Sequence, residues 1–180
     1  MWLPLIAFVL SFLGVYFLKK SALRLKIVAI PNERSLHNKV TPRGGGVIIA
    51  IVFLAFLLFF YITRQIMVAE FLVLFGGGLI MAVIGFLDDI LELKASIRFI
   101  IQFFAVGWGI YWIGGIPSTA FFERLPVLYG IANAVTVVAL VWFINSFNFI
   151  DGIDGLATSS ATFFSLSTGG YFLWQGIEPY

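Results

Sequence analysis

The stretch Val47–Ile62, with the sequence VIIAIVFLAFLLFFYI, decides the fold because it contains no charged side chain. A helix needs about 17–25 mostly apolar residues to cross a bilayer. This stretch is close to that length and apolar throughout. The rest of the chain is similar, since hydrophobic residues make up 61% of its 180 residues and charged residues only 11%. A soluble domain is about 45–50% apolar and about 25% charged. The composition therefore argues against a water-soluble single-core protein and against a disordered chain.

Charge and cysteine content exclude further classes of protein. The formal net charge is only +2. Nucleic-acid-binding proteins usually carry a strongly basic surface, so we expect no nucleic-acid partner. The sequence has no cysteine. Disulfide frameworks, thiolate nucleophiles and cysteine-based metal sites are therefore excluded.

Six windows of the sequence have the length and apolarity of transmembrane helices. They are Trp2–Leu18, Val47–Ile62, Phe71–Leu87, Phe99–Ile116, Pro126–Ile144 and Leu156–Trp174. The sixth is rich in serine and threonine and is expected to face protein rather than lipid, and Gly76–Gly78 in the third is expected to allow close helix packing. We therefore predict an all-α, polytopic helical membrane protein with about six transmembrane helices, forming a single transmembrane domain over residues 1–180.

The placement of lysine and arginine predicts the side of the membrane that each loop occupies. The loop after the first window holds seven of the eleven basic residues: Lys19, Lys20, Arg24, Lys26, Arg34, Lys39 and Arg43. Loops rich in these residues remain in the cytoplasm. The N-terminus is then outside, and the loops at 88–98 and 145–155 are cytoplasmic.

Three loops on the predicted cytoplasmic side are rich in polar residues and glycine, unlike the outer loops. They contain PNERSLH at 31–37 with TPRGGG at 41–46, GFLDD at 85–89, and NSFNFIDGIDG at 145–155. Each leads into the N-terminus of a window, where unpaired N–H groups and a partial positive charge favour anions. Arg43 and Arg98 lie at two of these entries. The pattern suits a phosphate-bearing ligand at the inner membrane surface.

Four aspartates in these loops would repel one another if the loops meet. Asp88 and Asp89 are adjacent, and Asp151 and Asp154 are three residues apart. Like charges at short range cost free energy, which a divalent cation would remove. Oxygen ligands without cysteine suit Mg²⁺ or Mn²⁺ rather than zinc. Taken singly, the adjacent pair also fits a solvated helix end and Asp-Gly-x-Asp-Gly fits a turn, so the site hypothesis depends on the three loops together.

These motifs resemble those of the polyprenyl-phosphate N-acetylhexosamine-1-phosphate transferases, the glycosyltransferase family 4 group that includes the phospho-N-acetylmuramoyl-pentapeptide transferase. The matching residues are PN-x-RS-x-H at 31–37, TPRGGG at 41–46, GF-x-DD at 85–89 and N-x-x-NF-x-DG-x-DGL at 145–156. The first two look closest to the bacterial undecaprenyl-phosphate GlcNAc-1-phosphate transferases that start O-antigen and related surface polysaccharides.

The resemblance implies a reaction. A UDP-linked N-acetylhexosamine gives its sugar 1-phosphate to undecaprenyl phosphate in the lipid bilayer, with release of UMP and with Mg²⁺, or Mn²⁺, as cofactor. The resemblance also implies a multi-pass protein of the bacterial inner membrane whose active face is cytoplasmic. A homodimer is an open expectation.

The resemblance also implies roles for individual residues. Asp88 and Asp89 are expected to be catalytic, either one as base or as nucleophile, and to activate the lipid phosphate. The expected metal ligands are Asp88, Asp89 and Asp151. The expected substrate-binding residues are Asn148, Asp151, Asp154, Arg43 and Arg98.

The chain departs from the family in its length. Family members have more spans, and their later cytoplasmic motifs, a further aspartate and a histidine-rich loop, have no counterpart here. We therefore expect the N-terminal part of a longer family fold, truncated after the sixth window and inactive alone. Two alternatives stay open at this stage: a fragment of a membrane transporter, and a non-catalytic membrane scaffold.

Overall fold

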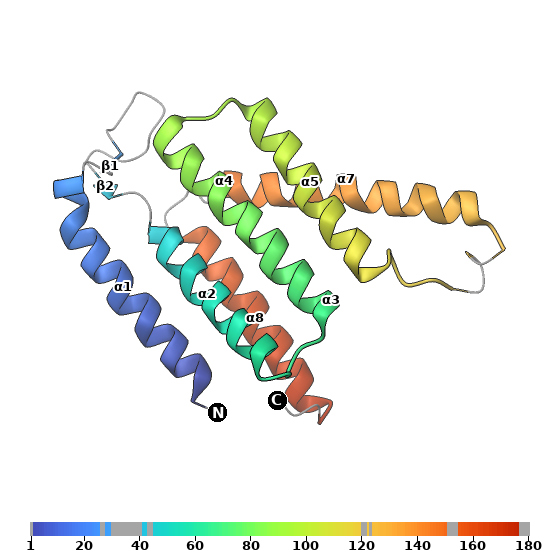
Figure 1. The fold of residues 1–180 in the computed structure, drawn as a ribbon, viewed down its shortest axis with the longest axis horizontal. Coiled ribbons are helices and arrows are strands. Elements are labelled where there is room, and N and C mark those ends of the chain that lie inside the picture. The colour runs from blue at the N-terminus through green and yellow to red at the C-terminus, as the bar shows by residue number, and fades with distance from the viewer. Residues whose placement is uncertain are drawn as a thin grey trace. The chain divides into compact units, whose positions relative to one another are not determined.

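The computed structural model describes residues 2–25, 28–29, 41–42, 45–119, 122, 124–150 and 155–176 (Figure 1). The chain forms two compact units, Met1–Gly115 and Ile116–Tyr180. Three of the expected site residues, Arg43, Asp151 and Asp154, lie outside the described residues.

The first unit is built mainly of helices. In chain order its elements are α1 (Leu3–Leu25), β1 (Val28–Ala29), β2 (Thr41–Pro42), α2 (Gly45–Ile62), α3 (Val68–Phe71), the π-helical turn η1 (Leu72–Gly76), α4 (Gly77–Leu91) and α5 (Ala95–Ile113). β1 and β2 pair antiparallel, with Val28 opposite Pro42 and Ala29 opposite Thr41. The predicted all-α class is confirmed, with this two-residue pair as its one addition among the described residues.

The helices of the first unit pack as neighbours, α1 against α2, α2 against α4, and α4 against α5 (Figure 1). Glycines permit the close approach of these helices. A Cβ at Gly14 would lie 2.5 Å from the Cγ2 of Ile48, and a Cβ at Gly78 would lie 3.4 Å from the ring of Phe53. Small residues at helix interfaces allow the close packing that holds helices together in a bilayer, as predicted for the glycine run of the third window.

The π-helical turn η1 interrupts the third helical stretch between α3 and α4. Such a turn changes the regular pattern of backbone hydrogen bonds within a helix. The indole Nε1 of Trp108 on α5 donates a hydrogen bond to the carbonyl oxygen of Leu72, the first residue of η1, at 2.7 Å. This bond ties α5 to the π-helical turn.

The second unit contains α7 (Pro126–Ile150) and α8 (Leu156–Trp174). A closed set of hydrogen bonds joins the start of this unit to α7. The N–H of Ile116 donates to Asn133 Oδ1 at 2.9 Å, and Asn133 Nδ2 donates to the carbonyl of Tyr129 at 2.9 Å. The hydroxyl of Tyr129 donates back to the carbonyl of Ile116 at 2.9 Å. The segment before α7 is therefore fixed to the first turns of the helix.

The structure contains five stretches long and apolar enough to cross a membrane within its described part: Leu3–Lys20, Gly45–Ile62, Val68–Leu91, Ala95–Ile113 and Pro126–Phe149. They correspond to the first five predicted windows, and the chain is a multi-pass helical membrane protein. The sixth window is also a helix, α8, with the predicted bounds. Its serine and threonine side chains make it less apolar than the other five, as the sequence indicates.

The predicted ends of the third and fifth windows are wrong. α4 continues to Leu91 instead of ending at Leu87, and α7 continues to Ile150 instead of Ile144. The polar side chains at these positions do not end the helices, because they extend from the helix surface while the backbone keeps its helical hydrogen bonds. Four motif residues therefore lie in helical turns rather than in loops: Asp88, Asp89, Asn145 and Asn148.

Candidate active site

The acidic pair lies at the C-terminal end of α4, where a short connection leads into α5. Asp88 and Asp89 are in the last turn of α4, which ends at Leu91. Glu92 then takes the left-handed conformation, with φ 49° and ψ 61°, and its N–H donates to the carbonyl of Asp88 at 3.0 Å. This backbone reversal lets α5 begin at Ala95 and return along α4.

The carboxylate of Asp88 links the two helices across this connection. Its Oδ2 accepts a hydrogen bond from Arg98 Nη1 at 2.6 Å, an ion pair between half-buried side chains that are 25% and 32% exposed for Asp88 and Arg98. Its Oδ1 accepts a hydrogen bond from the N–H of Leu93 at 3.1 Å. Each oxygen of Asp88 is therefore bound by one donor from the connection or from α5.

The helix dipoles explain why this pair forms. A carboxylate is unfavourable near the partial negative charge of a helix C-terminus, and a guanidinium is unfavourable near the partial positive charge of a helix N-terminus. Asp88 and Arg98 occupy these two positions, in the last turn of α4 and the first turn of α5. Their contact offsets both unfavourable placements.

Asp89 has a different environment from Asp88. Successive residues of an α-helix point about 100° apart around the axis, so the two side chains of the pair leave α4 in different directions. Asp89 is exposed, whereas Asp88 is half-buried against α5. The arrangement gives the end of α4 one carboxylate fixed by protein donors and a second at the surface.

Two asparagines of the third motif lie on α7 in the second unit, and one of them, Asn148, is expected to bind substrate. Asn145 is half-buried, and its Nδ2 donates to the carbonyl of Val141 at 2.8 Å. Asn148 is exposed one turn closer to the end of the helix at Ile150. The expectation that Asn145 lies in a loop is wrong, because the helix continues past it.

The structure thus brings together only part of the expected site. Asp88, Asp89 and Arg98 are neighbours at one helix connection of the first unit, and Asn148 belongs to the second unit. Arg43, Asp151 and Asp154 lie outside the described residues. Across the part of the chain that is described, no three carboxylate or histidine side chains lie close enough to hold a metal ion. The three-aspartate metal site and the meeting of the three loops stay predictions.

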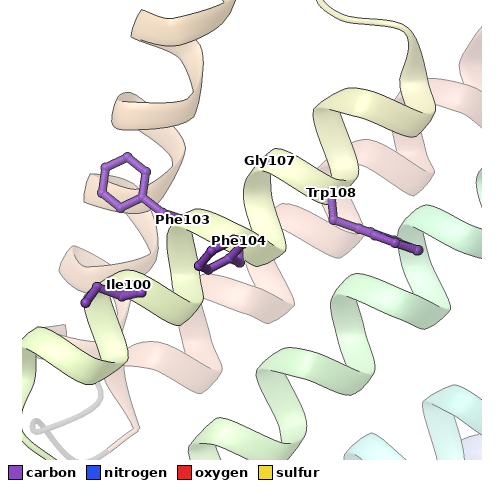
Figure 2. Close-up of a pocket in the computed structure, with 5 residues that line it drawn as sticks. All are labelled: Ile100, Phe103, Phe104, Gly107 and Trp108. Carbon is purple, nitrogen blue, oxygen red and sulfur yellow. The ribbon is translucent and has the colours of Figure 1, made fainter.

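A hollow on α5 is the feature that sequence reasoning missed. It has a volume of about 350 Å³ and is lined by Ile100, Phe103, Phe104, Gly107 and Trp108. Figure 2 shows these residues following one another along α5, with Gly107 between Phe104 and Trp108. Their spacing of three, four, seven and eight residues after Ile100 places them on one helical face. That periodicity, with a glycine among aromatic residues, was the available signal.

Known proteins match this chain over most of its length. The family model described as "Glycosyl transferase family 4" matches residues 71–179. A Bacillus subtilis (strain 168) protein named "Probable undecaprenyl-phosphate N-acetylglucosaminyl 1-phosphate transferase" is 33% identical over 84% of this chain and 43% of its own length. No solved structure matches significantly.

Two further relatives carry related names. The decaprenyl-phosphate N-acetylglucosaminephosphotransferase of Mycolicibacterium smegmatis is 32% identical over 85% of this chain and 40% of its own length. The phospho-N-acetylmuramoyl-pentapeptide-transferase of a Wolbachia species is 29% identical over 95% of this chain and 57% of its own length. The chain thus spans about half the length of these relatives or less. Since the family model covers more than half of the sequence, including the acidic pair and both asparagines, the chain belongs to glycosyl transferase family 4.

Proposed function

We propose that this chain carries part of the active site of a transferase that moves N-acetylhexosamine 1-phosphate from a UDP-sugar to undecaprenyl phosphate. In such a protein the reaction would release UMP and begin a cell-envelope polysaccharide such as an O-antigen. The names of the relatives support a polyprenyl-phosphate acceptor and a hexosamine phosphate as the transferred group. The UDP donor and the polysaccharide follow from the motif resemblance.

The observation that carries the proposal is the acidic pair at the end of a membrane-spanning helix. Asp88 and Asp89 lie within the last turn of α4, on the side that the basic loops assign to the cytoplasm. A lipid phosphate and a cytosolic nucleotide sugar can meet only at such a membrane surface. A transporter would place charged groups near the bilayer midplane instead, so the position of the pair favours surface chemistry.

The side chains present suit Mg²⁺ or Mn²⁺. Mg²⁺ binds through one or two carboxylates and keeps water and substrate phosphates as its other ligands. Asp89 is an exposed carboxylate. Asp88 retains lone pairs for a cation, because Leu93 N–H and Arg98 Nη1 each occupy one lone pair on a different oxygen. A bound divalent cation would neutralise charge on the phosphoryl groups. In this proposal Asp88 and Asp89 hold the cation, with Asp151 as a further ligand.

The hollow on α5 supports a lipid acceptor. Its first lining residue, Ile100, follows Arg98 by two residues, which is about 3 Å along the helix axis. The lining is apolar, and Phe104 is 72% exposed on a helix that is long and apolar enough to cross a membrane. The hollow extends from residue 100 to residue 108, or about 12 Å along α5. A prenyl chain that lies in it would present its phosphate at the start of α5, beside the acidic pair.

The test of the proposal is release of UMP by the purified whole protein, not by the isolated 180-residue chain, in lipid nanodiscs with UDP-N-acetylglucosamine, undecaprenyl phosphate and Mg²⁺. Asp89→Asn is expected to lower turnover by a factor of about 100 or more, because a metal-binding carboxylate is lost. Removal of divalent cations with EDTA should stop UMP release, and Mn²⁺ should restore it.

Glu70→Gln is the matched control, since it also removes one carboxylate but lies on α3 at the opposite end of the helical stretch from the acidic pair. Its turnover should equal that of the wild type. Equal turnover by Asp89→Asn and the wild type would refute the proposed role of the acidic pair. Release of UMP by the isolated 180-residue chain would refute the expectation that the chain is inactive alone.

A further inference from the structure

Arg98 is bound to the acidic pair in the structure. Its Nη1 lies 2.6 Å from Asp88 Oδ2, and the same carboxylate accepts the N–H of Leu93 through Oδ1. We propose that Arg98 is a positioning residue, which fixes Asp88 and thereby the orientation of the acidic pair, rather than a direct contact to a substrate phosphate. This inference rests on the proposed function and assigns a different task to one of its residues.

The first argument concerns geometry. Asp88 and Arg98 are ten residues apart and belong to two helices joined by residues 92–94. The connection contains no glycine, and Glu92 holds a left-handed conformation that is strained for a residue with a Cβ. Such a connection needs tertiary contacts to keep one shape. The carboxylate of Asp88 supplies them, since it receives donors from the connection and from α5.

The second argument concerns electrostatics. Removal of the guanidinium would leave Asp88 near the negative end of α4, with the N–H of Leu93 still bound to its carboxylate. Hydrogen bonds between charged groups are shorter and about twice as strong as neutral ones. The contact with Arg98, at 2.6 Å between two half-buried side chains, is therefore a stronger restraint on the carboxylate than the bond from Leu93.

The third argument concerns catalysis. A group that binds metal or activates a phosphate must be held within about 0.5 Å of its productive position by neighbouring side chains. Arg98 is the side chain that does so for Asp88. The contact engages one of the five N–H donors of the guanidinium, and it holds the Asp88 carboxylate in one orientation.

The test measures amide hydrogen exchange at Leu93 in the whole protein, by NMR or by mass spectrometry of overlapping peptides. Within the wild type, the amide of Leu93 should exchange more slowly than that of Ser96, which lies in the first turn of α5 where amides lack helical partners. This comparison needs no variant. Equal exchange of the two amides would overturn the proposal.

Two variants of Arg98 and one control extend the test. Arg98→Gln is expected to speed exchange at Leu93 by about tenfold, because a charge-assisted restraint on its acceptor is lost. Arg98→Lys keeps the charge and should stay within about threefold of the wild type. Lys94→Gln is the matched control, since it removes a neighbouring exposed positive charge at the N-cap of α5 and should leave Leu93 unchanged.

Kinetics then separate positioning from substrate contact. Arg98→Gln should lower kcat by about 10- to 100-fold while the KM values for both substrates stay within about twofold, and Arg98→Lys should restore most of the kcat. A raised KM with unchanged kcat, or unchanged exchange at Leu93, would overturn the proposal. If the wild type releases no UMP, the proposed function is wrong. The comparison of Leu93 exchange between the wild type and Arg98→Gln would still show whether Arg98 holds Asp88.

Discussion

Gly76 leaves the space that the indole of Trp108 occupies, because a Cβ at Gly76 would lie 2.6 Å from Trp108 Nε1. The same nitrogen donates to the carbonyl of Leu72 at 2.7 Å. A glycine in the π-helical turn and a tryptophan on α5 are therefore complementary in shape and in hydrogen bonding. Interhelical hydrogen bonds in a membrane contribute about 0.6–2 kcal/mol each.

Gly76→Ala is expected to lower the free energy of unfolding by about 1–3 kcal/mol, because the new methyl group displaces the indole. Unfolding in mixed micelles of increasing SDS content measures the change. Gly85→Ala is the matched control, since Gly85 lies in α4 with nothing within 4 Å of a Cβ. That variant should gain about 0.5–1 kcal/mol from helix propensity. Equal effects of the two substitutions would contradict the packing of Trp108 on Gly76.

Gly107→Val should fill the hollow on α5 without harming the fold, because a Cβ at Gly107 has nothing within 4 Å. If the hollow holds the prenyl chain, the KM for undecaprenyl phosphate should rise at least fivefold, which is about 1 kcal/mol. The KM for the UDP-sugar should not change. Steady-state release of UMP at varied acceptor concentration measures both constants.

The control for the hollow is Gly130→Val, the same change on α7 at a position that is also open. It should leave both KM values unaltered. An acceptor KM that is the same in all three proteins would mean that the prenyl chain lies elsewhere.

Asn133→Leu is expected to destabilise the second unit by about 2 kcal/mol, because the N–H of Ile116 loses its acceptor. The same SDS titration measures the loss. Thr136→Val removes a hydroxyl that bonds only to the carbonyl of Ala132 one turn earlier in its own helix, so it should change stability by less than about 0.5 kcal/mol. A loss of similar size in both variants would argue against the closed network at the start of α7.

Arg64→Gly should raise the free energy of unfolding by about 0.5–1 kcal/mol. Arg64 follows the end of α2 with φ 58°, a conformation that glycine adopts without a steric cost. Arg124 is exposed and has no such positive φ, so Arg124→Gly should give no gain. A thermal melt followed by circular dichroism is sufficient, and a lower midpoint for Arg64→Gly would disprove the steric argument.

The sequence alone predicted the transmembrane helices well, because long apolar stretches with few charges are rare outside membrane-spanning segments. Leu156–Trp174 matched the helix α8 at both ends, and the glycines at 76 and 78 lie at helix contacts as expected. The chain's family was also predicted correctly from its motifs. Helix ends at the membrane surface were predicted less well. Asp88 and Asn145 looked like loop residues, but their backbones continue the helix while their side chains find partners.

The ion pair of Asp88 and Arg98 could not be predicted from the sequence. A helix reversal of this kind usually shows itself by a glycine in the left-handed position, and here Glu92 takes that place. Without a glycine, the sequence does not indicate where α4 ends and the chain turns back. The contact between Asp88 and Arg98 depends on that turn, so it could not be predicted either. The joining of the acidic pair with Asp151 and Asp154 stays a prediction, as does a homodimer.

The connection between α4 and α5 has a consequence for the order in which the protein is made. Within the described part of the chain, the carboxylate of Asp88 is held by donors from Leu93 and Arg98, a few positions later in the sequence. During synthesis the chain emerges from its N-terminus, so this hairpin can close as soon as Arg98 and the first turns of α5 have entered the membrane. The orientation of Asp88 can therefore be set before α7 is translated.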